Sequence, residues 1–588
     1  MTDKEPDVLS PEIKFQLVRK LERHKVIGLA GTELKEHESK YLEFHRLSGV
    51  ILFERNIESL PQVGELIASV DEHLAGDDDL TPFVMADHEG DFVSVLRKSI
   101  GVPPSAMAIA AAGDPQLAFD VAYETGTAMA KLGANVVLGP VADCYLDPES
   151  PITGLRAFGR DPERVAEYVV ETIRGFAKAG ILTCAKHFPG HGSTPFDSHE
   201  TLPEVNKSLA DLRSGELIPF EAAVEAGVDL IMTAHVAFAF GEESDDGTPA
   251  SFDTRLIRGV LRKDLGFEGA VITDALEMVG AKRHAETRYG GLSSGFERTI
   301  LAGSDLMLYS APVPERLNVQ DGSEPMIAVE VMQTIIDTLS RVVDRERIDA
   351  KLKAAAKEHE GIRNFLAILD ESEQRVVRLR ERAVSVSGDS KPKAGGNVID
   401  LGHYPTTPVI YKTVAEQSLV LVRDPEAFLP VDGDAPWRLV PVVYHPNEAL
   451  KTQDLQGFFE LLCKRFPAWR VTAPVVGFEP DTTGMLVPEF AMDGGGTKQD
   501  ETLAGDALLL PVLSARGTPP EAVLGKLSDF VEQRQVPFVI ITGWPIIDWL
   551  PETTGALVTL GASPPVAAAT AGVLAGETQA TGSLSHVL

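Results

Sequence analysis

Short apolar runs recur along the N-terminal part of the chain and alternate with longer stretches of helical periodicity. Runs this short are typical of strands that are buried on both faces in a parallel sheet. We interpret eight of them as strands: residues 25–29, 49–53, 82–86, 135–138, 181–185, 229–233, 270–273 and 305–308. Helical periodicity is clearest at 115–132, 162–179 and 208–226.

Eight β–α units within roughly the first 350 residues predict a (β/α)8 barrel, although an open doubly wound sheet would also fit the alternation. The polar residues favour closure, because ionisable side chains stand at or just after the ends of five candidate strands. A single such residue usually caps a helix, whereas in a barrel the carboxyl ends of all strands meet at one mouth. These side chains are Asp87, Asp143, Lys186 with His187, His235 and Asp274.

The C-terminal part of the chain predicts a second, smaller α/β layered domain. Helical periodicity near 336–382 is followed at 385–407 by a stretch rich in Ser, Gly and Pro, which indicates a linker. Apolar runs then resume at 419–422, 439–443, 507–513, 538–542 and 556–560, with helical stretches at 455–465, 520–533 and 565–574. We therefore divide the chain into a catalytic barrel (1–370), a helix and linker (371–407) and a C-terminal α/β domain (408–588).

Composition narrows the choice of partners. A chain of 588 residues is too long to fold around one hydrophobic core. Its 87 acidic and 54 basic residues give a formal charge of −33. Such a surface repels phosphate backbones and anionic headgroups, so we expect neither nucleic acid nor a membrane as partner. Cys144, Cys184 and Cys463 form no disulfide framework and no zinc spacing. The polar first residues and the absence of any apolar run of 18 residues predict a cytoplasmic protein.

The segment 186–203, KHFPGHGSTPFDSHETLP, follows a predicted strand and is dense in Gly, Pro and His, so we expect a polar loop. Asp197 and His199 are two residues apart, and extended backbone would place both side chains on the same side. A carboxylate beside an imidazole fixes its tautomer and supports general acid/base chemistry near neutral pH. A purely structural pair remains an alternative. A metal site is disfavoured by the absence of an HExxH motif; it would use His187, His191, His199 and His235.

KHFPGHG followed by DSH resembles the signature of family 3 glycoside hydrolases that act as β-N-acetylhexosaminidases. The resemblance extends over residues 13–355. Matching segments are LFERN (52–56), DHEG (87–90), GPVAD (139–143), GLR with FG (154–156 and 158–159), MTAH (232–235) and GFEGAVITDALEM (266–278). Residues 419–429 and 556–584 resemble, more loosely, the C-terminal α/β domain of many members.

The resemblance implies a role for each matched residue. Asp274 corresponds to the nucleophile, His199 to the acid/base and Asp197 to its partner. His191 also lies within the motif, and we assign it to the architecture of the loop. The residues that would hold the N-acetylglucosamine ring are Asp87, Arg156, Lys186 and His187. We expect no cofactor and no metal.

Three positions depart from the family pattern. Asp91 replaces a Gly, Val95 replaces an Arg that helps to hold the sugar, and Ala275 replaces an Asp. Arg97, two residues after Val95, is the candidate that would take over this sugar contact.

The function implied is that of a retaining exo-β-N-acetylglucosaminidase. It would remove terminal β-linked N-acetylglucosamine from a carbohydrate such as a peptidoglycan-derived fragment, through a covalent glycosyl-aspartate. One alternative is a β-glucosidase-like hydrolase, against which the DSH element argues. Another is an N-acetylglucosaminide phosphorylase, since a His acid/base does not repel phosphate as a carboxylate would. A third alternative is a protein that binds sugar but no longer catalyses. The presence of Asp197, His199 and Asp274 argues against it, because such a protein would lose these residues first.

Overall fold

A computed structural model describes most of the N-terminal region and parts of the C-terminal one. The described residues are 21–74, 80–147, 150, 152–196, 198, 201–238, 247–289, 292–313, 360–387, 408–423, 438–439, 442–443, 464–465, 470–471, 477–480, 486–489, 508–513, 538–542, 555–560, 564–575, 577–583 and 585. The statements below concern these residues.

Eight parallel strands form the N-terminal sheet, in the order β11-β9-β7-β6-β3-β2-β1-β12. A parallel bridge between Ile272 and Leu306 joins the two outer strands and closes the barrel. The prediction of a (β/α)8 barrel is therefore confirmed. The strands are β1 (Lys25–Gly28), β2 (Gly49–Leu52), β3 (Phe83–Ala86), β6 (Val136–Val137), β7 (Leu182–Phe188), β9 (Leu230–Thr233), β11 (Ala270–Thr273) and β12 (Met307–Tyr309).

Side chains alternate between the two faces of the barrel wall, as the period of a strand requires. Val26, Met85 and Ile272 belong to one buried cluster, which gathers residues from all eight strands or their ends. Their neighbours Ile27 and Val84 pack instead in a second cluster with the surrounding helices. Because both faces are buried, the strands appear in the sequence as continuous apolar runs.

The helices around the barrel largely follow the predicted segments. α7 (Pro162–Ala179) begins at Asp161, whose carboxylate accepts from the Glu163 N–H at 3.1 Å, and ends at Gly180 with φ 84°. The other helices of this layer are α2 (Glu36–His45), α3 (Leu60–Leu74), α4 (Arg97–Ile100), α5 (Ala106–Ala111), α6 (Gln116–Leu132), η4 (Arg255–Asp264), α10 (Val279–Tyr289) and α11 (Leu292–Ala302).

The stretch of helical periodicity at 208–226 is helical in the structure but divided by a break. The structure has two helices there, α8 (Leu209–Arg213) and α9 (Leu217–Glu225). Ser208 and Asp211 cap each other at the start of α8, and the helix ends at Ser214. The break turns Glu216 inward, where it is 2% exposed and pairs with Lys207. The break thus coincides with an ion pair between buried Glu216 and the partly exposed Lys207.

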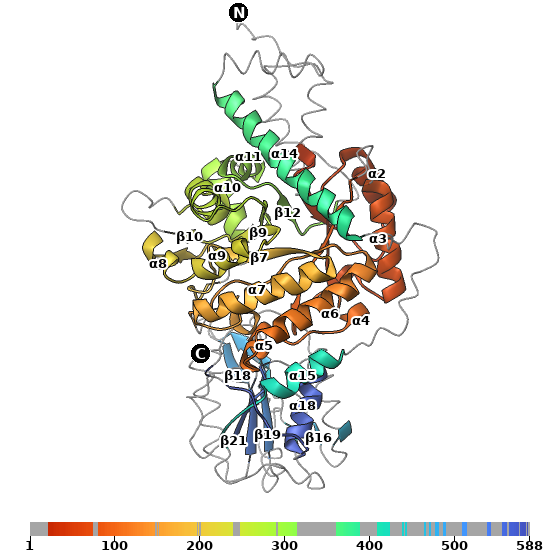
Figure 1. The fold of residues 1–588 in the computed structure, drawn as a ribbon, viewed down its shortest axis with the longest axis vertical. Coiled ribbons are helices and arrows are strands. Elements are labelled where there is room, and N and C mark those ends of the chain that lie inside the picture. The colour runs from red at the N-terminus through yellow and green to blue at the C-terminus, as the bar shows by residue number, and fades with distance from the viewer. Residues whose placement is uncertain are drawn as a thin grey trace, which may run out of the picture.

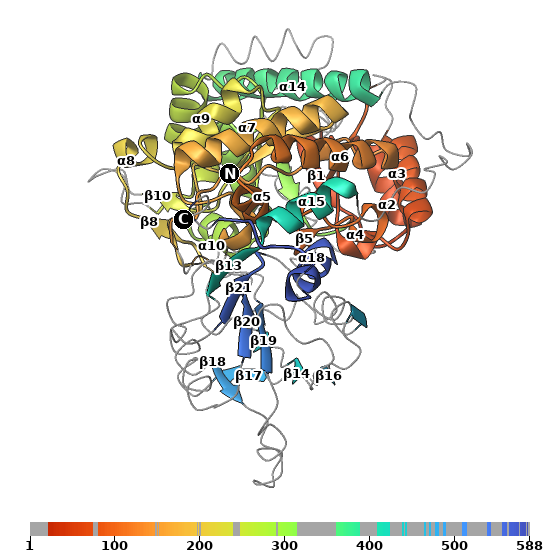
Figure 2. The ribbon, with the colours of Figure 1, turned by 60° about the horizontal axis from the view of Figure 1, so that its bottom comes forward.

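Helix α14 (Glu360–Ser387) lies across the barrel on the side away from the C-terminal sheet (Figures 1 and 2). Its arginines contact groups that precede the strands: Arg375 pairs with Asp305 at 2.9 Å and Arg382 with Asp229 at 2.5 Å. Its residues Val376 and Leu379 join the cluster inside the barrel. We propose that the barrel unit extends through this helix, because it closes the N-terminal end.

The C-terminal region forms a sheet in the order β13-β21-β20-β19-β14-β16, with β15 also pairing β19. β13 is antiparallel to β21, and the other pairs of this sheet are parallel. The elements are α15 (Val409–Ser418), β13 (Val420–Arg423), β14 (Arg438–Leu439), β15 (Val442–Val443), β16 (Arg470–Val471), β19 (Leu508–Leu513), β20 (Phe538–Thr542), β21 (Gly555–Val558) and α18 (Pro564–Leu574). The hairpin of β17 (Gly477–Pro480) and β18 (Leu486–Glu489) was not anticipated. The helix predicted at 520–533 lies outside the described residues, as does that at 455–465 apart from 464 and 465.

The two regions share a core. Figure 2 shows α15 between the barrel and the C-terminal sheet, beside α5 and α18. The Tyr411 and Thr125 hydroxyls are 2.6 Å apart, and the Ser105 hydroxyl donates to the Leu560 carbonyl at 2.7 Å. Tyr411 and Leu560 also belong to the same apolar cluster as barrel residues. The domains are therefore packed together and not merely tethered.

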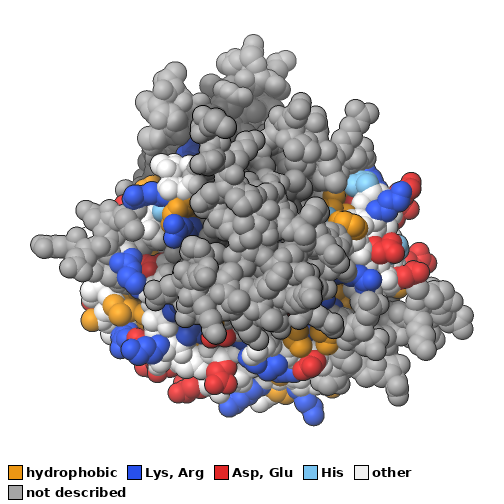
Figure 3. All heavy atoms as spheres, turned by 90° about the horizontal axis from the view of Figure 1, so that it is seen from above, with side chains coloured by type: hydrophobic (Ala, Val, Ile, Leu, Met, Phe, Trp, Pro, Cys, Tyr) orange, Lys and Arg blue, Asp and Glu red, His pale blue; other side chains and the backbone are white. Residues whose placement is uncertain are grey.

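Two observations concern the described surface. From above the view of Figure 1, basic and acidic side chains are intermingled along the margin of the described part (Figure 3). Among the helices that the structure describes, none is long and apolar enough to cross a membrane.

Candidate active site

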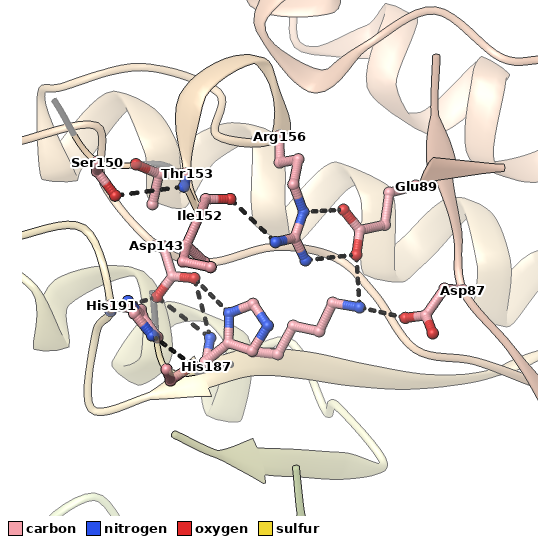
Figure 4. Close-up of polar contacts among 11 residues, drawn as sticks. Asp87, Glu89, Asp143, Ser150, Ile152, Thr153, Arg156, His187 and His191 are labelled. Carbon is pink, nitrogen blue, oxygen red and sulfur yellow. Dashed lines mark hydrogen bonds and ion pairs between the residues drawn. The ribbon is translucent and has the colours of Figure 1, made fainter. Parts of the chain in front are cut away.

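Four of the predicted sugar-binding residues converge at the carboxyl ends of the barrel strands (Figure 4): Asp87, Arg156, Lys186 and His187. Asp87 links β3 to the short strand β4 (His88–Gly90), and Lys186 and His187 stand near the end of β7. Arg156 ends the short helical turn η2 (Gly154–Arg156) that follows β6. β7 runs three residues beyond its predicted end, so the lysine and histidine are held by a strand and not by a loop.

Lys186 is the centre of a buried ionic network. Its side chain is 2% exposed, and Nζ lies 2.5 Å from a carboxylate oxygen of Asp87 and 2.5 Å from one of Glu89. Arg156 donates to both oxygens of Glu89, at 2.7 and 2.8 Å, and to the Ile152 carbonyl at 2.9 Å. Two cations and two carboxylates thus alternate from Asp87 to Arg156, and their charges balance.

The network keeps its members charged despite burial. Burial by itself would raise the pKa of Glu89, but the charges of Arg156 and Lys186 outweigh it and hold this pKa well below its ordinary value. Burial likewise opposes the charge of Lys186, yet Asp87 and Glu89 raise its pKa above the ordinary value. The site therefore presents fixed hydrogen-bond donors and acceptors at neutral pH.

Asp143 organises the start of the motif loop. This fully buried carboxylate accepts from the His187 backbone N–H at 3.2 Å and the His191 N–H at 2.7 Å, and it lies 2.6 Å from His187 Nδ1. Burial by itself would raise the pKa of Asp143. The interactions with His187 and His191 outweigh this effect, so the pKa lies below its ordinary value. A charged Asp143 keeps the proton on Nδ1 of His187, which leaves Nε2 as the atom able to meet a ligand.

Asp274 follows β11 directly and is half-buried. Its N–H donates to the Thr233 carbonyl at 3.1 Å, and its carboxylate accepts from the Ala275 N–H at 2.7 Å. His235 holds the next peptide, with Nε2 3.0 Å from the Ala275 carbonyl and Nδ1 2.8 Å from the Ser251 hydroxyl. The backbone on both sides of Asp274 is thereby held by the ends of two neighbouring strands.

Asp197 and His199 lie outside the described residues, but Ser198 between them is described and 2% exposed. Its hydroxyl lies 3.1 Å from Nε2 of His191, and its carbonyl accepts from the Gly280 N–H at 3.3 Å. A Cβ on Gly280 would stand 2.9 Å from the Thr201 carbonyl oxygen, so this close approach requires glycine. The centre of the loop is thus attached to α10, which follows the Asp274 segment.

Residues 16–354 match the glycosyl hydrolase family 3 N terminal domain. The chain belongs to this family. It is 33% identical over 305 residues to a beta-hexosaminidase of Stenotrophomonas maltophilia strain R551-3, covering 50% of this chain and 87% of the relative. It is 36% identical over 288 residues to a beta-hexosaminidase of Pseudomonas aeruginosa strain LESB58, covering 48% and 81% respectively.

The family 3 likeness also extends through the second domain. The solved structure of a glycoside hydrolase family 3 beta-N-acetylglucosaminidase from Paenibacillus sp. str. FPU-7 is 26% identical. The two structures superpose with a TM-score of 0.76 over 97% of this chain and 98% of that one. The predicted family and two-domain α/β fold are therefore confirmed, and the chain is a glycoside hydrolase by family.

Two carboxylates of the candidate site, Glu89 and Asp143, received no role from the sequence. Both lie in segments that match the family, and Asp143 was also predicted at the mouth of the barrel, but the resemblance gave neither residue a function. Asp143 was selected by its position after a strand, the same signal that selected Asp87, whereas Glu89 lies within the short strand β4 and carried no such signal. Among the described residues, no group of three or more His, Cys, Asp or Glu side chains is arranged to hold a metal ion.

Arg97 lies at the start of α4 and contacts its own loop. It donates from Nη2 to the Phe92 carbonyl at 2.5 Å and from Nε to the Ser94 carbonyl at 3.1 Å. Nε also lies 3.4 Å from a carboxylate oxygen of Glu54. Its role as the replacement for the sugar-binding arginine missing at Val95 stays a prediction.

Proposed function

We propose that the chain is a retaining exo-β-N-acetylglucosaminidase in which Asp274 is the nucleophile, His199 the acid/base and Asp197 its partner. The observation that carries the proposal is the ionic network from Asp87 to Arg156, at the same end of the barrel as Asp274. The beta-hexosaminidase names of the relatives and the beta-N-acetylglucosaminidase title of the Paenibacillus structure support the choice of substrate.

The network suits recognition of sugar hydroxyls. Carboxylates accept hydrogen bonds and ammonium or guanidinium groups donate them, so a balanced row of both can bind groups that donate and accept at once. The side chains of Asp87 and Arg156 are 23% and 19% exposed, whereas that of Glu89 is 5% exposed. Asp87 and Arg156 would therefore meet the sugar, with Lys186 and Glu89 fixing their positions and His187 Nε2 adding a further contact.

The reaction then has two steps. Asp274 attacks the anomeric carbon while His199 donates a proton to the glycosidic oxygen, and the aglycone leaves as an alcohol. In the second step His199 takes a proton from water, the water oxygen attacks the same carbon, and the bond to Asp274 breaks. Two inversions give net retention. A peptidoglycan-derived fragment, with N-acetylglucosamine at its non-reducing end, is the proposed substrate.

Hydrolysis is favoured over phosphorolysis by the charge balance of the described site. Lys186 and Arg156 are each already paired with a carboxylate. An incoming phosphate would need positive charge beyond what the sugar-binding network neutralises, because phosphate sites are built from cations and N–H groups.

The test compares three conditions on purified protein: p-nitrophenyl β-N-acetylglucosaminide, the matching β-glucoside, and the first substrate with inorganic phosphate. We expect release of free N-acetylglucosamine, first seen by NMR as the β-anomer. The glucoside should react at least about 10³-fold more slowly in kcat/KM, since a site that hydrogen-bonds a group discriminates strongly against its loss. Comparable rates on both glycosides would indicate a glucosidase. A sugar 1-phosphate product would indicate a phosphorylase.

A further inference from the structure

One large apolar side chain stands in solvent on the motif loop. Phe196 is 57% exposed, and its N–H donates to the hydroxyl of Thr194 at 3.2 Å. Thr194 itself is 2% exposed. The fold thus holds the backbone at this point and leaves the ring outside its core, at a cost in exposed apolar area.

The chain before Phe196 is firmly attached. The hydroxyl of Ser193 donates to buried Glu216, and Lys207 lies 2.8 Å from this hydroxyl and 2.5 Å from the same carboxylate. A Cβ on Gly190 would stand 2.7 Å from Cβ of Glu216, so the loop and α9 are in close contact. The exposure of Phe196 is therefore set by an anchored stem.

The chain after Phe196 is attached to the segment that follows the nucleophile. Ser198, two residues on, contacts His191 and Gly280 as described above. Both attachments lie on loops at the carboxyl end of the barrel, where Asp274 also stands. Phe196 is consequently an exposed ring on a loop at the carboxyl end of the barrel, the same end at which Asp274 and the network around Lys186 lie.

The chemistry of a phenyl ring defines its partner. Its face carries partial negative charge and attracts polarised C–H bonds, and a flat contact also buries apolar area. A pyranose ring presents such a face of C–H groups. In the proposed function, the network around Lys186 binds the sugar that is cleaved off. The phenyl ring of Phe196 is therefore available to the next sugar, on the leaving-group side.

We propose that Phe196 is a stacking platform for the aglycone sugar, and that it selects substrates whose leaving group is itself a pyranose. This inference rests on the proposed N-acetylglucosaminidase function and names the aglycone class. Phe196 binds the leaving group and takes no part in proton transfer or bond formation. Its contribution is lost when the leaving group has no ring.

The experiment compares N,N′-diacetylchitobiose with β-N-acetylglucosaminyl fluoride, whose leaving group is a single atom. Phe196→Ala and Phe196→Leu should each lower kcat/KM on the disaccharide by about tenfold, mainly through KM, because contact with the aglycone is lost. On the fluoride both variants should stay within about twofold of wild type. Phe196→Tyr should retain the activity on the disaccharide. Phe44→Ala, which removes a 54% exposed ring from α2, is the matched control.

Each other outcome has a defined meaning. Equal losses on both substrates, unchanged activity of Phe196→Ala on the disaccharide, or an equal loss in Phe44→Ala would overturn the platform. A Phe196→Leu variant as active as wild type would overturn the stacking argument, since leucine is apolar but has no flat face. Wild-type protein that turns over neither substrate would contradict the proposed function, and the platform with it.

Discussion

Arg156 and Glu89, 67 residues apart in the chain, meet through two hydrogen bonds of 2.7 and 2.8 Å at the mouth of the barrel. Lys186 contacts the same carboxylate at 2.5 Å. This carboxylate thus balances two cations that burial would otherwise disfavour. Its position makes Glu89 the residue on which the geometry of the proposed sugar-binding network depends.

We expect Glu89→Gln to destabilise the protein by about 3–5 kcal/mol, because it leaves two buried cations undercompensated. It should also raise KM, since Arg156 and Lys186 lose the group that orients them. Urea unfolding measures the first effect and steady-state kinetics the second. Glu54→Gln is the matched control: Glu54 is 59% exposed in its pair with Arg97, and its loss should cost under about 1 kcal/mol. Equal costs would contradict the argument.

Asp274→Ala should abolish turnover and leave the fold intact, because covalent catalysis requires its nucleophile. Circular dichroism checks the fold. In Asp274→Gly, azide should restore release of the chromophore and produce the α-glycosyl azide, since the anion can enter the space of the lost carboxylate. Activity within about tenfold of wild type in the alanine variant would show that another group is the nucleophile.

His199→Ala should affect substrates unequally. Proton donation matters little when the leaving group is a stable anion, so glycosides of acidic phenols should retain a faster first step than glycosides of alcohols. General acid/base help is typically worth about 10²–10⁴-fold, and the larger loss is expected for poor leaving groups. A plot of log kcat/KM against leaving-group pKa should therefore become steeper in the variant. An unchanged slope would count against His199 as the acid.

Stability should rise with pH between about 4.5 and 6.5 because of two buried imidazoles. Burial, with the charge of Arg97, lowers the pKa of His88 to about 3; burial, with His187, lowers that of His191 to about 4. In this window the unfolded chain binds protons on both and the folded chain on neither, so lower pH favours unfolding. Urea unfolding at several pH values should show this slope. His88→Gln should reduce it, and an unchanged slope would exclude His88 as a cause.

A truncated chain ending at Ser387 should retain measurable turnover on a chromogenic substrate, because the proposed catalytic residues and α14 all precede this point. It should be less stable, since Tyr411, Val558 and Leu560 pack in the same cluster as barrel residues and their loss exposes apolar area. Circular dichroism and thermal unfolding measure the stability. A well-folded barrel without activity would show that the second domain supplies part of the site.

The eight barrel strands could be placed from the sequence because each is buried on both faces and therefore appears as an apolar run. The break within the helical stretch 208–226 could not be placed in this way. The periodicity there continues across Gly215, and the break accompanies the pair of Lys207 with Glu216, which no local pattern reveals. The division of the chain at 370 likewise falls inside α14, whose arginines reach strands far away in the sequence.

By itself, the sequence determined the alternation of strands and helices, the motif loop and the position of Asp274 after the seventh strand. The tertiary structure alone decided which charges meet. Lys186 pairs with Asp87 across 99 residues, and Asp143 contacts His187 across 44. The sequence does not reveal such pairs, because the strand ends come together only when the sheet closes. The register of the sheet then determines which side chains lie next to one another at the mouth of the barrel.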